Sequence, residues 1–86
     1  MPLIYCDLDI FSNIQHINII DAYGNKTTVS ANIPMMPNYI SELCHQQNIS
    51  NIHLFGNAKY AQGLAQEIHQ TYSLKYQKQD LNIEVN

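Results

Sequence analysis

Residues 51–72 have the sequence NIHLFGNAKYAQGLAQEIHQTY, which predicts a strand that turns directly into a helix. The run Ile52–Phe55 is rich in strand-forming side chains, and Gly56 with Asn57 ends it. Asn57 can cap the helix by accepting a hydrogen bond from a backbone N–H of the first turn. Apolar residues then recur every third or fourth position as far as Tyr72. This spacing predicts a helix with one apolar face.

Three stretches before this unit predict strands. Residues 3–8, LIYCDL, form an almost continuous apolar run, which favours a central strand that is buried on both faces. Residues 14–20 and 27–33 flank the turn-forming cluster DAYGN, so residues 14–33 predict a hairpin with its tip at Gly24-Asn25. The first three strands can therefore pair as an antiparallel meander.

The first helix is predicted to begin near Pro37 or Asn38. Proline suits a first helical turn because its fixed φ matches the helix and no N–H is needed there. Asn48 suits a left-handed C-cap at the far end. The apolar stripe of this helix comprises Ile40, Leu43 and Cys44, with Glu42 off the stripe.

The end of the chain predicts one more strand. Residues 73–80 form a polar connection, and residues 81–85 alternate apolar with polar side chains. Because strands joined through a helix are parallel, the order β-β-β-α-β-α-β predicts an α/β (α+β) fold with a mixed five-stranded sheet and two packed helices. Gly63, inside the second predicted helix, indicates either a close approach to a neighbouring element or simple tolerance.

The composition limits the classes of function. A length of 86 residues predicts one small domain, 1–86, for which a partner or self-association is a reasonable expectation. The chain has four Lys plus Arg against seven Asp plus Glu, so we expect no tight binding to nucleic acid, which needs clustered positive charge. No apolar run approaches the roughly 20 residues of a membrane span, and the first residues do not resemble a signal peptide. We therefore expect a cytoplasmic protein.

The cysteines and histidines do not form a metal-binding pattern. Cys6 and Cys44 fall on different predicted elements without metal-ligand spacing, so we expect two buried thiols. The four histidines also lack such spacing, and we expect them to be surface or hydrogen-bonded residues. Abundant Asn, Gln and Ile with no Arg or Trp is typical of AT-rich coding sequences, and indicates a low-GC bacterium or its phage.

The predicted order of elements, which opens with Ile4-Tyr5-Cys6-Asp7 on the first strand, resembles the core of the ribonuclease H-like superfamily. The resemblance implies a catalytic Asp on the first strand, matched by Asp7, and a Glu on the first helix, matched by Glu42. The stretch 55–64, FGNAKYAQGL, is similar to the family's fourth strand and following helix. Gly56 or Asn57 stands where the second Asp belongs, and a last helix with its acidic residue has no counterpart, which implies a trimmed core.

The same resemblance implies an enzymatic alternative, a metal-dependent nuclease or phosphohydrolase. Such enzymes gather carboxylates around two divalent ions. Here Asp7, Asp9 and Glu42 would hold Mg²⁺ or Mn²⁺, and the two aspartates could share an ion only where the strand ends or bulges. The two aspartates also resemble the opening of haloacid-dehalogenase-type phosphatases, although Ile10 and Phe11 stand where that family has a small residue and Thr.

Because the carboxylate set is incomplete, the leading hypothesis is a small non-enzymatic interaction or accessory protein without a cofactor, encoded by a phage or mobile element. Residues 81–85 and 27–33 are the expected sheet edges, and edges pair readily with another chain. A protein partner or a homodimer would satisfy them. A third hypothesis is a small-ligand pocket at the carboxyl ends of the parallel strands, near Asp9, Gly56 and Asn57.

Overall fold

The computed structural model describes residues 1–86 and contains five strands and two α-helices in the expected order. The strands are β1 (Leu3–Leu8), β2 (Ile14–Ile20), β3 (Lys26–Asn32), β4 (Asn51–Gly56) and β5 (Asn82–Val85). The helices are α1 (Met36–Gln47) and α2 (Ala58–Tyr76), with a short 3-10 turn at Ile33–Met35 before α1. The predicted α/β fold with the order β-β-β-α-β-α-β is confirmed.

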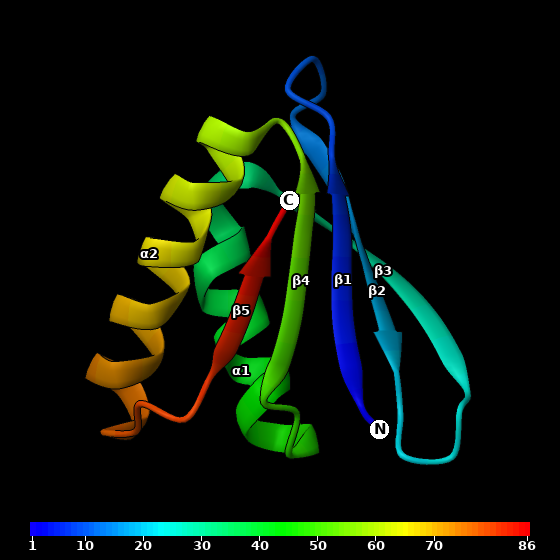
Figure 1. Cartoon of the computed structure of the whole chain (residues 1–86), viewed down its shortest axis with the longest axis vertical. Helices are drawn as coiled ribbons and strands as arrows, with labels where there is room; N and C mark the ends of the chain where they lie inside the picture. Colours follow the sequence, from blue (N-terminus) through cyan, green and yellow to red (C-terminus); the bar gives the residue numbers. More distant parts are fainter.

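The strands form one mixed sheet in the order β3-β2-β1-β4-β5 (Figure 1). β2 is antiparallel to both β1 and β3, whereas β1 pairs with β4, and β4 with β5, in parallel. β1 is therefore the central strand, as predicted, and β3 and β5 are the two edges.

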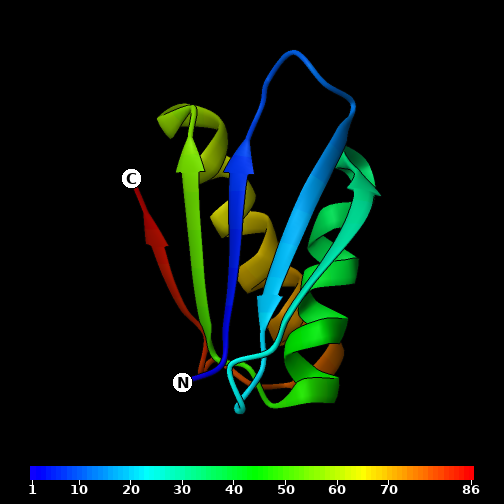
Figure 2. The same cartoon turned by 90° about the vertical axis from the view of Figure 1, so that its right-hand side faces the viewer.

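Both helices cover the same face of the sheet (Figure 2). The crossovers β3-α1-β4 and β4-α2-β5 run in the same direction across the sheet, and right-handed crossovers that run the same way put their helices on one side. The buried core lies between that face and the helices. The other face, which we call the open face, carries no helix.

The open face corrects one expectation. Residues 3–8 were predicted to be buried on both faces, but only alternate side chains of β1 lie beneath the helices. Leu3 and Tyr5 are half-buried on the open face and Asp7 is exposed there. The Tyr5 ring stacks on Phe55 of β4 with centroids 6.4 Å apart, so apolar side chains on the open face shield one another across strands. The β1 side chains under the helices are Ile4, Cys6 and Leu8.

The predicted caps of α1 and α2 are confirmed. Asn48 follows α1 with a left-handed φ of 58°. The Asn57 side chain accepts a hydrogen bond from the Tyr60 N–H at 2.9 Å and so caps α2. At its other end α2 continues to Tyr76, one helical turn into the segment predicted as a polar connection.

The β2–β3 hairpin is organised by the side chain of Asp21. Its carboxylate accepts hydrogen bonds from the backbone N–H groups of Asn25 and Tyr23, each at 2.9 Å. The Asn25 bond is the main cause that lowers the pKa of Asp21, with Tyr23 contributing. Gly24, with φ 84°, takes the positive-φ position of the predicted tip. These contacts hold the register of β3 on β2.

Further sequence-based expectations concern cysteines and glycines. Cys6 and Cys44 are buried free thiols, as predicted, and desolvation raises the pKa of each to about 12. A Cβ atom at Gly63 would meet no atom within 4 Å, so the interpretation of a close approach is wrong and simple tolerance holds.

Neither helix combines the length and apolar character that crossing a membrane requires.

Candidate functional site

Two of the three carboxylates considered for metal binding lie on opposite sides of the sheet. Asp7 is exposed on the open face, where its strand position pairs with Phe55. Glu42 is exposed on α1, which covers the other face, and its Oε1 accepts a hydrogen bond from Gln46 Nε2 at 3.1 Å. The sheet therefore stands between Asp7 and Glu42.

Asp9 lies in the loop that follows β1. Its Oδ1 accepts a hydrogen bond from the Phe11 N–H at 3.0 Å, so the carboxylate takes part in the turn. Nowhere in the structure do three His, Cys, Asp or Glu side chains gather closely enough to hold a metal ion.

The β1–β2 loop is fastened by Gln15, a residue that sequence reasoning missed. The side chain is only 1% exposed, and its Oε1 accepts a hydrogen bond from the Asp9 N–H at 3.0 Å. Its Nε2 donates to the carbonyl oxygens of Asp9 at 2.6 Å and Ser12 at 2.9 Å. The signal was present in the sequence, because Gln15 takes the inward parity of Ile17 and Ile19 in an alternating strand. This fastening holds the loop in one shape with Phe11 93% exposed at its surface.

The carboxyl ends of β1 and β4 are closely packed. Gly56 has φ 106°, and a Cβ atom there would overlap the carbonyl oxygen of Leu8. The position therefore needs glycine for the approach of two backbones. None of the three cavities in the molecule is lined by Asp9, Gly56 or Asn57.

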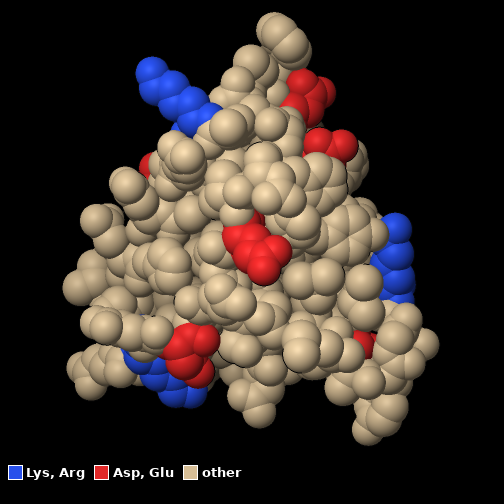
Figure 3. Space-filling view, in the orientation of Figure 1, with Lys and Arg blue, Asp and Glu red and all other residues tan.

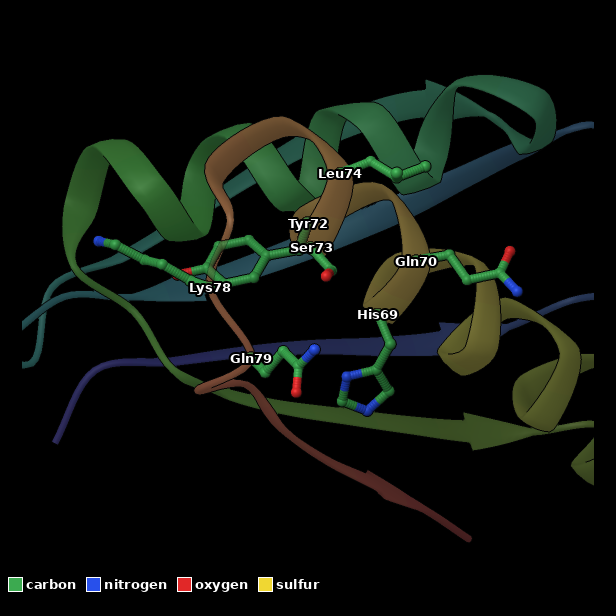
Figure 4. A pocket seen from close by; sticks show the side chains of 7 residues that line it. All are labelled: His69, Gln70, Tyr72, Ser73, Leu74, Lys78 and Gln79. Carbon is green, nitrogen blue, oxygen red and sulfur yellow. The ribbon is translucent and has the colours of Figure 1, made fainter.

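The largest cavity, about 580 Å³, lies at the other end of the molecule, between α2 and the segment leading to β5 (Figure 4). Most of its lining side chains are exposed and polar, so the cavity is a surface groove rather than an enclosed pocket. Burial, followed by the contribution of Asp80, raises the pKa of Tyr72 on this groove to about 12. The lining residues are His69, Gln70, Tyr72, Ser73, Leu74, Lys78 and Gln79.

The two sheet edges differ in length and in protection. β5 has four residues, whereas β3 has seven. Natural edge strands are commonly protected by charged side chains, proline or bulges. β3 carries one charge, Lys26 at its first residue, and it pairs with β2 without a bulge from Lys26 to Asn32. The segment Thr27–Asn32 is thus a free edge without charge, proline or bulge.

The hydrogen bonds of the hairpin show which backbone groups of β3 face outward. Just beyond the two ends of the β2–β3 pairing, the Asp21 N–H donates to the Asn25 carbonyl oxygen and the Ile33 N–H donates to the Asn13 carbonyl oxygen. Both bonds follow the register of the pairing, so the odd-numbered residues of β2 and β3 form the hydrogen-bonded pairs. Antiparallel strands alternate such pairs with pairs whose groups point away. The even-numbered residues of β3 therefore direct N–H and C=O to the free edge. They are Lys26, Thr28, Ser30 and Asn32.

Charged side chains are few, with four Lys plus Arg and seven Asp plus Glu in the chain. In Figure 3 the acidic and basic groups on the visible face stand in small separate clusters among much larger areas of other residues. On the open face, Lys26 Nζ lies 5.5 Å from the centroid of the Tyr5 ring. On the face that Figure 3 shows, no large area of one charge sign marks a binding site.

Comparison with known protein families and with curated proteins finds no match to this chain.

Proposed function

We propose that this protein is a small protein-binding module that acts through the free edge of β3. The observation that supports the proposal is an edge of seven residues whose segment Thr27–Asn32 carries no charge. Its outward N–H and C=O groups can form a ladder with a strand of another chain. A binding module of this kind needs no cofactor and no catalytic residue.

We also propose that the fold is a trimmed ribonuclease H-like core. The strand order β3-β2-β1-β4-β5, with β1 and β4 parallel, supports this assignment, as does the position of Asp7 on the central strand. Fold alone does not carry function. The separation of Asp7 from Glu42 by the sheet favours a binding role over metal-dependent hydrolysis, because that chemistry needs carboxylates that converge on the ions.

The proposed function is tested by blocking the outward N–H of Ser30. In Ser30→Pro the ring replaces a donor that faces the free edge, whereas Ser30→Ala keeps the donor. Both variants lose the contact of the Ser30 hydroxyl with His16, so they differ mainly at the edge. We expect native mass spectrometry of tagged protein from its natural host to find the same bound chains with wild type and Ser30→Ala, and none with Ser30→Pro.

Two results would contradict the proposal. One is an unchanged set of bound chains in Ser30→Pro. The other is hydrolysis of nucleic acid or a phosphoester that depends on Mg²⁺ or Mn²⁺ and is lost in Asp7→Asn, which would favour the enzymatic alternative.

A further inference from the structure

We infer that the strand which pairs with β3 is β3 of a second copy of this chain, antiparallel, with Val29 at the two-fold axis. This inference rests on the proposed function and names its partner. It depends on three features of the strand: the parity of its backbone groups, the side chains on its two faces, and the position of its one charge.

The backbone groups of β3 suit pairing with themselves. With Val29 on the axis, Thr28 lies opposite Ser30 of the partner subunit and Lys26 lies opposite Asn32 of the partner subunit. All four are even-numbered residues, whose N–H and C=O groups face outward, so each of these positions forms a hydrogen-bonded pair. The full length of the strand, Lys26–Asn32, is used.

The side chains of β3 also suit pairing with a second copy of the strand. Val29 is half-buried and packs against the hydrophobic core on the helix-covered face. On the axis it would meet Val29 of the partner subunit in a non-hydrogen-bonded pair, in which side chains come closest. A β-branched pair of this kind stabilises antiparallel strands, and it would continue the core across the two-fold axis.

The charge of the strand is compatible with a second copy. Lys26 would lie opposite an uncharged residue, Asn32 of the partner subunit, so no like charges face each other across the pair. The net charge of each copy is −3, a modest repulsion for association at physiological salt. The resulting sheet would contain both copies, with all helices on one side, because a two-fold axis normal to the sheet preserves its faces.

Cysteine cross-linking tests the register. In a non-hydrogen-bonded antiparallel pair the Cα atoms lie about 4.5 Å apart, within the range of a disulfide. We expect Val29→Cys to form a disulfide-linked dimer under mild oxidation in the folded protein. Cys6 and Cys44 are buried and do not compete.

Thr27→Cys and Ala31→Cys provide the controls. Each alone places identical cysteines about 14 Å apart, which is too far for a disulfide. An equimolar mixture of the two should form a mixed dimer, because Thr27 lies opposite Ala31 of the partner subunit. Efficient linking of either variant to itself, or absence of linking in both Val29→Cys and the mixture, would overturn the inference.

Light scattering during gel filtration of the purified protein gives a second test. We expect a dimer that dissociates on dilution for wild type and Ser30→Ala, and a dissociation constant raised about tenfold or more in Ser30→Pro, which loses outward donors from both copies. If Ser30→Pro fails to fold, Thr28→Pro with Thr28→Val as its control tests the same edge.

The two proposals fail differently. A wild-type protein that stays monomeric throughout the micromolar range overturns the second-copy inference. The proposed function would still stand if host chains bind wild type and are lost in Ser30→Pro. If Ser30→Pro weakens neither the binding of host chains nor the dimer, both proposals are wrong.

Discussion

Gly56 and Gly63 occupy backbone positions with opposite requirements. Gly56 combines a positive φ of 106° with contact against the Leu8 backbone, whereas Gly63 is helical and its missing side chain faces open space. We expect Gly56→Ala to lower the free energy of unfolding by about 3 kcal/mol or more. Gly63→Ala should raise it by about 0.5–1 kcal/mol. Urea denaturation measures both, and similar values for the two variants would contradict the structure around Gly56.

Ser41 is a buried position whose side chain lowers the stability of the fold. It is fully buried in α1, and its hydroxyl has no hydrogen-bond partner. A buried polar group without a partner destabilises the fold, so we expect Ser41→Ala to raise the free energy of unfolding by about 1 kcal/mol.

Ser73→Ala is the control for this prediction, because Ser73 lies in α2 but is only half-buried. It should show only the gain from helix propensity, about 0.5 kcal/mol. Thermal unfolding would resolve the difference, and a loss of stability in Ser41→Ala would show that the hydroxyl has a partner in solution.

The β1–β2 loop shows how one buried side chain can hold an irregular element. Gln15→Leu would leave the Asp9 N–H and the carbonyl oxygens of Asp9 and Ser12 without their partner. We expect a loss of about 1–3 kcal/mol in the free energy of unfolding. Amide hydrogen exchange in the loop should also become faster, since its fastening is gone.

Gln66→Leu is the matched control, because Gln66 is exposed on α2 and makes no such bonds. Its effect should stay within about 0.5 kcal/mol. Unchanged exchange in the loop of Gln15→Leu would mean that the turn of Asp9 alone holds the loop.

The C-terminal end of α2 was not predicted by the local sequence pattern. Residues 73–80 were predicted to be a polar connection, but α2 includes Ser73–Tyr76, and the Tyr76 ring stacks on His45 of α1 with centroids 3.9 Å apart. This contact between helices accompanies the extra helical turn, and its partner is distant in the sequence. The caps at Asn48 and Asn57, by contrast, were predicted correctly because they depend only on neighbouring backbone groups.

The whole molecule should lose stability at alkaline pH. The pKa of both Cys6 and Cys44 is raised by burial to about 12, whereas unfolded thiols ionise near about 8.5. Above the unfolded pKa the unfolded chain releases protons that the folded chain retains, so stability is complete below that value and is lost as pH rises toward the folded pKa. The expected window is therefore about pH 9 to 12.

Urea denaturation at a series of pH values measures this loss. Each thiol contributes a slope of up to about 1.4 kcal/mol per pH unit inside the window. The variant with Cys6→Ala and Cys44→Ala should be less stable at neutral pH but should show a flatter decline. Equal slopes in the variant and the wild type would assign the alkaline loss to other groups, such as Tyr72.

The sequence by itself determined the order of the elements, the hairpin tip and the helix caps, because periodicity and capping involve residues close together in the chain. It also indicated correctly that the hairpin strand and the last strand would be sheet edges. Only the tertiary structure decided which face of β1 is covered and that Asp7 and Glu42 lie on opposite sides of the sheet. The apolar run of β1 is compatible with one covered face or two. The choice depends on the strand order, which sets the direction of both crossovers through contacts between residues far apart in the chain.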